Sequence, residues 1–206
     1  MATQLHLVLD AEGVTDSVSQ TRLPWPTPVA LDPPTELPVL GPCGFGVPFD
    51  GTSGVTAAEV AGFGLSATPC VTIGLAYDAV PSAATLFAGG AVGVALVPVD
   101  GLTAAVEAVL HTSVGDLVVR WPSMPLSTPG TEITVAVDGD AAVLVVDGSI
   151  ADRRPIVGAL APTTGLWAIG AAIDGTGPFT GRLLGLDVAT TLSLLVADAA
   201  ADAAAR

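Results

Sequence analysis

The residues that could do chemistry in this chain are few, and none stands in a pattern that builds a catalytic centre. Retaining glycoside hydrolysis needs two carboxyl groups about 5–5.5 Å apart, and a strand provides them by placing acidic residues at i, i+2 and i+4 on one face. Here Glu132 is followed at these spacings by Thr134 and Ala136. The remaining glutamates stand alone: Glu12, Glu36, Glu59 and Glu107. We therefore expect no glycosidase activity.

Nucleophilic and phosphate-binding chemistry lack their usual sequence signals as well. His6 and His111 fall in predicted strands, and the chain contains no Gly-x-Ser-x-Gly elbow. We expect both to be strand histidines whose ring nitrogens are hydrogen-bonded. The glycine-rich stretch 41–46 includes Pro42 and opens no helix, so it cannot offer helix-terminal N–H groups to a phosphate. The sequence predicts a protein that is not an enzyme.

Cysteine spacing and acidic loops give no metal site. Cys43 and Cys70 are 27 residues apart, which matches no Cys-x-x-Cys ligand pair. They could form one disulfide, but we favour two buried thiols, since cysteine is readily buried. Calcium prefers oxygen ligands, and loop aspartates are abundant, yet no Asp-x-Asp-x-Asp cluster occurs. We expect no cofactor, keep Ca²⁺ as the one open alternative, and assign no metal ligand.

Composition narrows the class of partner. The chain has 206 residues, of which 50% are hydrophobic and 13% charged, with six cationic residues, no lysine and a net charge of -14. A nucleic-acid-binding protein needs a Lys/Arg footprint, and an anionic membrane surface would repel this chain. Asp10 and Glu12 interrupt the early apolar run, so we expect no secretory signal. The uncharged windows 60–77, 79–99 and 155–173 resemble strands and turns rather than membrane spans.

The elements that must position these residues are short strands, because the dominant hydrophobic period is two. Residues 131–137 show it best, with Ile133, Val135 and Val137 on one face. Other predicted strands cover residues 5–9, 70–77, 85–87, 92–97, 104–111, 117–121, 143–146, 166–169 and 182–188. Asp-Gly pairs, which favour tight hairpin turns, stand at 50–51, 100–101, 138–139, 147–148 and 174–175. The pattern predicts an antiparallel sandwich or barrel.

Two segments break the strand pattern. Residues 20–48 are rich in proline, which makes regular pairing patchy, and we interpret them as an ordered excursion of a domain spanning 1–192. The Ala-rich segment 193–206 predicts a short helix with Ser193 as its N-cap. Four residues in this segment or directly before it would share one apolar face: Leu192, Leu195, Val196 and Ala199. This face could bind a partner, or it could pack on the protein's own sandwich.

Several fragments, in order, resemble the concanavalin A-like sandwich in its laminin-G-like form. They are Gly41–Gly46 with Phe49–Thr52, Ile133–Gly139, Leu144–Gly148, Leu166–Gly170, Phe179–Leu183 and Ala189–Ser193. The chain departs from that pattern at Val137, where the family has tyrosine, and at Leu184-Gly185, where it has an acidic pair. The resemblance implies an antiparallel two-sheet jelly roll followed by the short C-terminal helix. It places Phe49, Trp167 and Phe179 in packing between the sheets.

This resemblance also suggests a function class. Short sandwiches of this kind look like minor tail or capsid-surface proteins of bacteriophages, so we predict a non-enzymatic virion protein assembled in the host cytoplasm. Its partners would be other virion proteins and further copies of itself, attached through the 20–48 stretch and the Leu192, Leu195, Val196 and Ala199 face. The alternative is a module that binds host glycans. The chain has few aromatic side chains on which a sugar ring could stack, the candidates being Trp25, Tyr77, Trp121 and Trp167.

Overall fold

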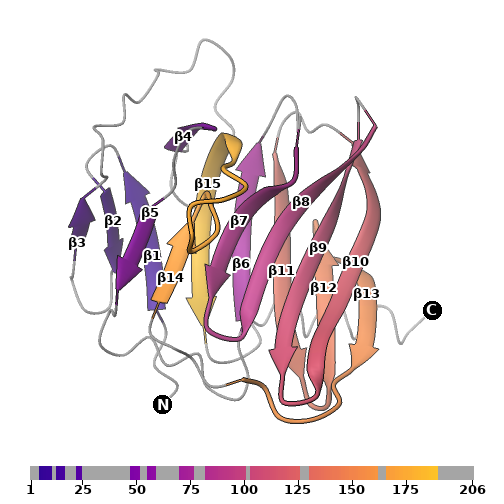
Figure 1. The fold of residues 1–206 in the computed structure, drawn as a ribbon. Helices are drawn as coiled ribbons and strands as arrows, with labels where there is room; N and C mark the ends of the chain where they lie inside the picture. The colour runs from indigo at the N-terminus through magenta and orange to yellow at the C-terminus, as the bar shows by residue number, and fades with distance from the viewer. Residues whose placement is uncertain are drawn as a thin grey trace.

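The computed structural model is an all-β protein made of two antiparallel sheets (Figure 1). It describes residues 5–10, 13–16, 22–24, 47–51, 55–58, 70–76, 82–100, 103–125, 130–161 and 166–189. Within this described part of the chain, no helix is long and apolar enough to cross a membrane.

The larger sheet has nine strands. In spatial order, eight of them are β13 (Ser149–Pro155), β12 (Ala141–Val146), β11 (Thr131–Asp138), β6 (Cys70–Ala76), β15 (Thr180–Ala189), β1 (Leu5–Asp10), β2 (Gly13–Asp16) and β3 (Arg22–Pro24). The ninth, β4 (Val47–Asp50), pairs with the start of β15, while β1 pairs with the end of the same strand.

The smaller sheet has six strands. Their spatial order is β10 (Gly115–Pro125), β9 (Thr103–Thr112), β8 (Val92–Asp100), β7 (Ala84–Gly89), β14 (Leu166–Ile169) and β5 (Val55–Ala58). Figure 1 shows β8, β9 and β10 lying over β11, β12 and β13, so the two sheets form the layers of a sandwich.

One apolar cluster fills the space between the layers and explains why the sheets pack. Alternate residues from both sheets enter it, as the period of two requires. Ile73, Ile133 and Leu144 come from the larger sheet, and Leu96 and Leu110 from the smaller one; each is at most 1% exposed. The predicted two-sheet antiparallel sandwich is thus confirmed, and Phe49 and Phe179 lie in its core as expected. The C-terminal helix and the boundary at residue 192 lie outside the described residues.

Two hairpin turns fix the register of β11, β12 and β13. At the second, Asp147 and Gly148 have φ of 47° and 76° between the paired Val146 and Ser149, the two positive values of a type I′ turn. At the first, Asp138 already pairs with Ala141, so the turn residues are Gly139 and Asp140, and only the glycine has positive φ. That turn is therefore of the II′ kind and lies one residue later than the Asp-Gly pair suggests.

Candidate functional site

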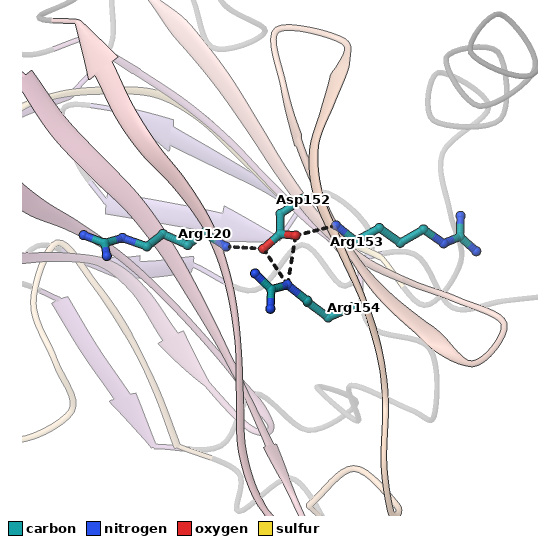
Figure 2. A network of polar contacts seen from close by, with 4 residues as sticks. All are labelled: Arg120, Asp152, Arg153 and Arg154. Atoms are coloured by element: carbon teal, nitrogen blue, oxygen red, sulfur yellow. Dashed lines mark hydrogen bonds and ion pairs between the residues drawn. The ribbon is translucent and has the colours of Figure 1, made fainter.

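A group of polar contacts lies at a seam between the edges of the two sheets. There β10 of the smaller sheet runs beside β13 of the larger one, and the Asp152 carboxylate joins them (Figure 2). Its Oδ2 accepts a hydrogen bond of 3.0 Å from the backbone N–H of Arg120. Its Oδ1 accepts one of 2.9 Å from the backbone N–H of Arg153. An edge strand has backbone N–H groups that no neighbouring strand accepts from. In β10, the Asp152 carboxylate accepts the hydrogen bond of one such group, the Arg120 N–H.

The guanidinium group of Arg154 completes the contacts of this carboxylate. Its Nε lies 3.0 Å from Oδ1 and 3.1 Å from Oδ2 of Asp152. The Asp152 side chain is only 15% exposed, whereas that of Arg154 is 57% exposed. A largely covered carboxylate with this many donors is well satisfied, and through these hydrogen bonds Asp152 joins the edges of the two sheets, a contact that we call the Asp152 clamp.

A β-bulge aims Asp152 at the opposite sheet. The ladder between β12 and β13 pairs Leu144 with Asp152 but Val145 with Ile150, which leaves Ala151 without a cross-strand partner. Ala151 packs against the core instead. A bulge bends its strand and redirects the neighbouring side chain, and here the redirected residue is the one that reaches β10.

The arginines of the seam do not converge on one ligand. Arg120 Nε pairs with Glu107 Oε1 at 3.1 Å, and Arg153 Nη1 pairs with Asp138 Oδ2 at 3.0 Å. Figure 2 shows the Arg120 and Arg153 side chains extending in opposite directions from the seam. The seam therefore offers separate pairs of a donor and an acceptor on two faces of the molecule rather than a single anion pocket.

The Arg120–Glu107 pair stands on the outer face of the smaller sheet, beside small residues. Arg120 lies opposite Glu107 in β9, and Glu107 lies opposite Ala95 in β8. In the neighbouring row, Val118 is 42% exposed, and a Cβ added to Gly93 would meet nothing within 4 Å. We call this surface, formed by Gly93, Ala95, Glu107, Val118 and Arg120, the β8–β10 ledge. It combines an open apolar floor with a charged, hydrogen-bonding rim.

The contacts of Asp152 should make the free energy of unfolding depend on pH. Burial acts to raise the pKa of Asp152, but the hydrogen bonds from the Arg120 N–H, from Arg154 and from the Arg153 N–H outweigh it, so that pKa lies below its ordinary value. A carboxyl group with a depressed folded-state pKa stabilises the protein above its unfolded-state pKa, and this contribution is lost as the pH falls through the folded-state value.

We expect Asp152→Asn to lower the free energy of unfolding by about 1–3 kcal/mol near neutral pH, because an amide NH₂ would face an N–H donor. The difference from wild type should shrink below about pH 4. Urea denaturation at a series of pH values measures it, and Asp140→Asn, which removes an exposed carboxylate from a hairpin turn, is the control. A deficit that is the same at every pH would contradict the assignment.

The described glutamates and the described histidine do not form a hydrolytic site. Glu107 and Glu132, the two glutamates among the described residues, lie in different sheets. His111 Nδ1 lies 2.7 Å from Asp116 Oδ1 across the β9–β10 hairpin, so it is a hydrogen-bonded strand histidine as expected. Within the described residues, no hydroxyl or thiol is hydrogen-bonded to its other ring nitrogen. A histidine and an aspartate without a nucleophile do not make a triad.

Of the other candidate residues predicted from the sequence, some fall among the described residues and others do not. Cys70 is buried in β6, while Cys43 falls outside the described residues, so their pairing stays a prediction. Trp121 is partly buried and packs against the core, which reduces its use as a platform. Among the described residues, no group of three or more His, Cys, Asp or Glu side chains could hold a metal ion. The residues predicted to bind a partner also lie outside the described residues: Leu192, Leu195, Val196 and Ala199.

Sequence reasoning missed the seam. The available signal was the polar segment 149–155, which holds the adjacent Arg153 and Arg154 in a chain with only six cations. It shows no clear alternation, because an edge strand with a bulge presents neither face regularly. For that reason the sequence pattern did not predict a strand over residues 149–155.

No protein-family model matches the sequence, and comparison with curated proteins finds no significant match. Solved structures, in contrast, share the fold. Domain 4 of AbnA, a GH43 extracellular arabinanase from Geobacillus stearothermophilus, solved in complex with arabinotriose, matches with a TM-score of 0.63 and 19% identity over 96% of this chain and 98% of that chain. The CBM40 domain of the Ruminococcus gnavus IT-sialidase, bound to alpha2,3 sialyllactose, matches with 0.54 and 14% over 71% and 96%.

A third similar structure, from work on ganglioside-dependent cell entry of botulinum neurotoxin type C, has a TM-score of 0.65 and 7% identity. It matches 99% of this chain, which spans 51% of that structure's chain. All three contain β-sandwich domains, and such low identities establish the fold alone. The class that the fold defines is therefore a two-sheet antiparallel β-sandwich. The laminin-G-like and bacteriophage resemblances stay predictions.

Proposed function

We propose that this chain is a non-catalytic, glycan-binding β-sandwich module. The observation that carries the proposal is the β8–β10 ledge, where the half-exposed Arg120–Glu107 pair stands beside the open floor at Gly93 and Ala95. Ligand sites combine apolar surface with a few fixed polar groups that set orientation. Sugars present hydroxyl groups next to apolar C–H faces, so the guanidinium can donate to them and the carboxylate can accept from them.

The comparisons support this function over the bacteriophage role. Among the similar structures, the CBM40 domain is bound to alpha2,3 sialyllactose, domain 4 of AbnA is in complex with arabinotriose, and the cell entry of botulinum neurotoxin type C depends on gangliosides. The virion location, the virion partners and the homo-oligomer predicted from sequence stay predictions. A glycan-binding module would serve on a particle surface as an adhesin, so the two readings are compatible.

A glycan microarray of neutral and acidic oligosaccharides tests the proposal. We expect wild-type protein to bind a defined subset, and Arg120→Ala to weaken that binding about 10-fold or more, since hydrogen bonds to charged groups contribute about 1.5–3 kcal/mol. Arg153→Ala is the matched control, because it removes an equally exposed, ion-paired arginine that points the other way. The same loss in both variants, or no binding by wild type, would contradict the β8–β10 ledge as the site.

A further inference from the structure

A second polar pair lies on the same outer face as the β8–β10 ledge. His111 of β9 lies opposite Asp116 of β10, and its Nδ1 is 2.7 Å from Asp116 Oδ1. These two side chains are 48% and 61% exposed. In β9, Ala108 and Leu110 belong to the core. Since successive strand residues point to opposite faces, His111 and Glu107 share the outer face, which therefore carries polar pairs in two places.

An exposed apolar row separates the two pairs. Val109 in β9 lies opposite Val118 in β10 and Gly93 in β8. It stands midway along β9 between Glu107 and His111. Val118 is exposed, and a Cβ added to Gly93 would meet nothing within 4 Å, so this floor is open to a ligand. Residues two apart along a strand are separated by about 7 Å, which places the two polar pairs about 14 Å apart.

Both pairs keep hydrogen-bonding groups that a ligand can use. A carboxylate only accepts hydrogen bonds, so the contact with Asp116 assigns the proton of His111 to Nδ1. The other ring nitrogen, Nε2, has no hydrogen-bond partner among the described residues and is left to accept from a hydroxyl group. The contact between Arg120 and Glu107 joins Nε to Oε1, so the Nη groups can donate and Oε2 can accept.

The charge on this face favours an uncharged ligand. With histidine counted as uncharged, Glu107 and Asp116 contribute two negative charges and Arg120 contributes one positive charge, in a chain of net charge -14. A sugar carboxylate would compete with Glu107 for the guanidinium and would be repelled by the Asp116 carboxylate. The hydroxyl groups of a neutral sugar can donate to the carboxylates and accept from the guanidinium without that repulsion.

We propose that the glycan site extends from the β8–β10 ledge to the His111–Asp116 pair and binds an uncharged oligosaccharide that lies along the strands. This inference rests on the proposed glycan-binding function. A six-membered ring with bonds of about 1.5 Å spans about 3 Å between opposite atoms, so two or more linked sugars match a separation of about 14 Å better than one. One end of the chain of sugars hydrogen-bonds to Arg120 and Glu107, the other to His111 and Asp116, and its C–H faces cover Gly93.

Ligand length and charge provide the first test. Isothermal titration compares the neutral oligosaccharides found on the array with their component monosaccharides and with their sialylated forms, using full-length wild-type protein. We expect a neutral oligosaccharide to bind about 10-fold or more tightly than either, because only it contacts both pairs without repulsion. A monosaccharide of equal affinity, or a tighter sialylated form, would overturn this inference and leave the proposed function standing. Absence of glycan binding would overturn both.

Asp116→Ala tests the second pair directly. We expect this variant to bind the neutral oligosaccharide about 10-fold or more weakly than wild type, since hydrogen bonds to charged groups are among the stronger ones. Asp138→Ala is the matched control, because it removes another exposed, ion-paired aspartate that lies in the larger sheet. Equal affinities in the two variants, together with a loss in Arg120→Ala, would confine the site to the β8–β10 ledge and overturn the extension.

Gly93→Val tests whether the ligand covers the floor between the pairs. The added side chain would enter open space, and a β-branched residue suits a strand, so the midpoint of urea denaturation should stay near that of wild type. The same side chain would stand where the sugars lie, and we expect affinity for the neutral oligosaccharide to fall about 10-fold or more. A folded Gly93→Val protein that binds like wild type would overturn the inference.

Discussion

Replacing Gly170 with alanine is expected to lower the free energy of unfolding by about 2–5 kcal/mol. Gly170 follows β14 with φ of 73°, a left-handed conformation that costs an L-residue about 1–2 kcal/mol. A Cβ at this position would also run into the ring of Phe49, and overpacking a core costs about 1–3 kcal/mol more. The backbone at Gly170 is held in place because its N–H donates to the Leu86 carbonyl at 3.0 Å, and Phe49 is enclosed in the core at 8% exposure.

Gly175→Ala separates the two causes. Gly175 has φ of 81° in the same loop, but a Cβ there would meet nothing within 4 Å. We expect this variant to lose only the conformational part, about 1–2 kcal/mol. Urea denaturation of both variants and wild type measures the difference. Equal losses would mean that the Phe49 contact contributes nothing, and a stable Gly170→Ala protein would contradict the packing at this corner.

The second large effect is expected for Phe179→Ala. Phe179 is 0% exposed and its ring centroid lies 6.2 Å from that of Phe49. Its backbone is also held by two hydrogen bonds: its N–H donates to the Gly170 carbonyl at 2.7 Å, and its carbonyl accepts from the Gly51 N–H at 3.0 Å. Truncating a buried phenylalanine typically costs about 3–5 kcal/mol, which is a large share of the stability of a domain this size.

Phe179→Leu is the control for this truncation, because it keeps most of the buried volume and removes only the aromatic contact. We expect it to lose about 1.5 kcal/mol or less, with the backbone hydrogen bonds intact. Thermal and urea unfolding of the two variants provide the measurement. A Phe179→Ala protein less than 1 kcal/mol weaker than wild type would show that the start of β15 is not anchored as the structure describes.

Strands with regular alternation could be predicted from the sequence, and irregular ones could not. Residues 131–137 and 143–146 fall inside β11 and β12 because each places one apolar face on the core. β13 was not predicted, since its bulge at Ala151 breaks the period. β3 and β4 lie in or at the end of the proline-rich stretch 20–48, where proline weakens the expectation of pairing.

Tertiary contacts of the candidate site lay beyond local sequence signals. Asp152 and Arg120 are 32 positions apart, and nothing near either residue indicates that the carboxylate of one accepts the N–H of the other. The β8–β10 ledge depends on which residues of three strands share a row, and register is set by turns and bulges rather than by composition. The Phe49 and Phe179 packing was predicted only through family resemblance, and their contact with Gly170 was not.

We propose that this sandwich binds a glycan without changing it. The most direct measurement is isothermal titration of wild-type protein with the best glycan from the array, followed by chromatography of the recovered sugar. We predict saturable binding to one site, at least about 10-fold weaker in Arg120→Ala than in Arg153→Ala, and recovery of the sugar intact. Absence of saturable binding, or a shortened sugar in the recovered sample, would contradict the claim.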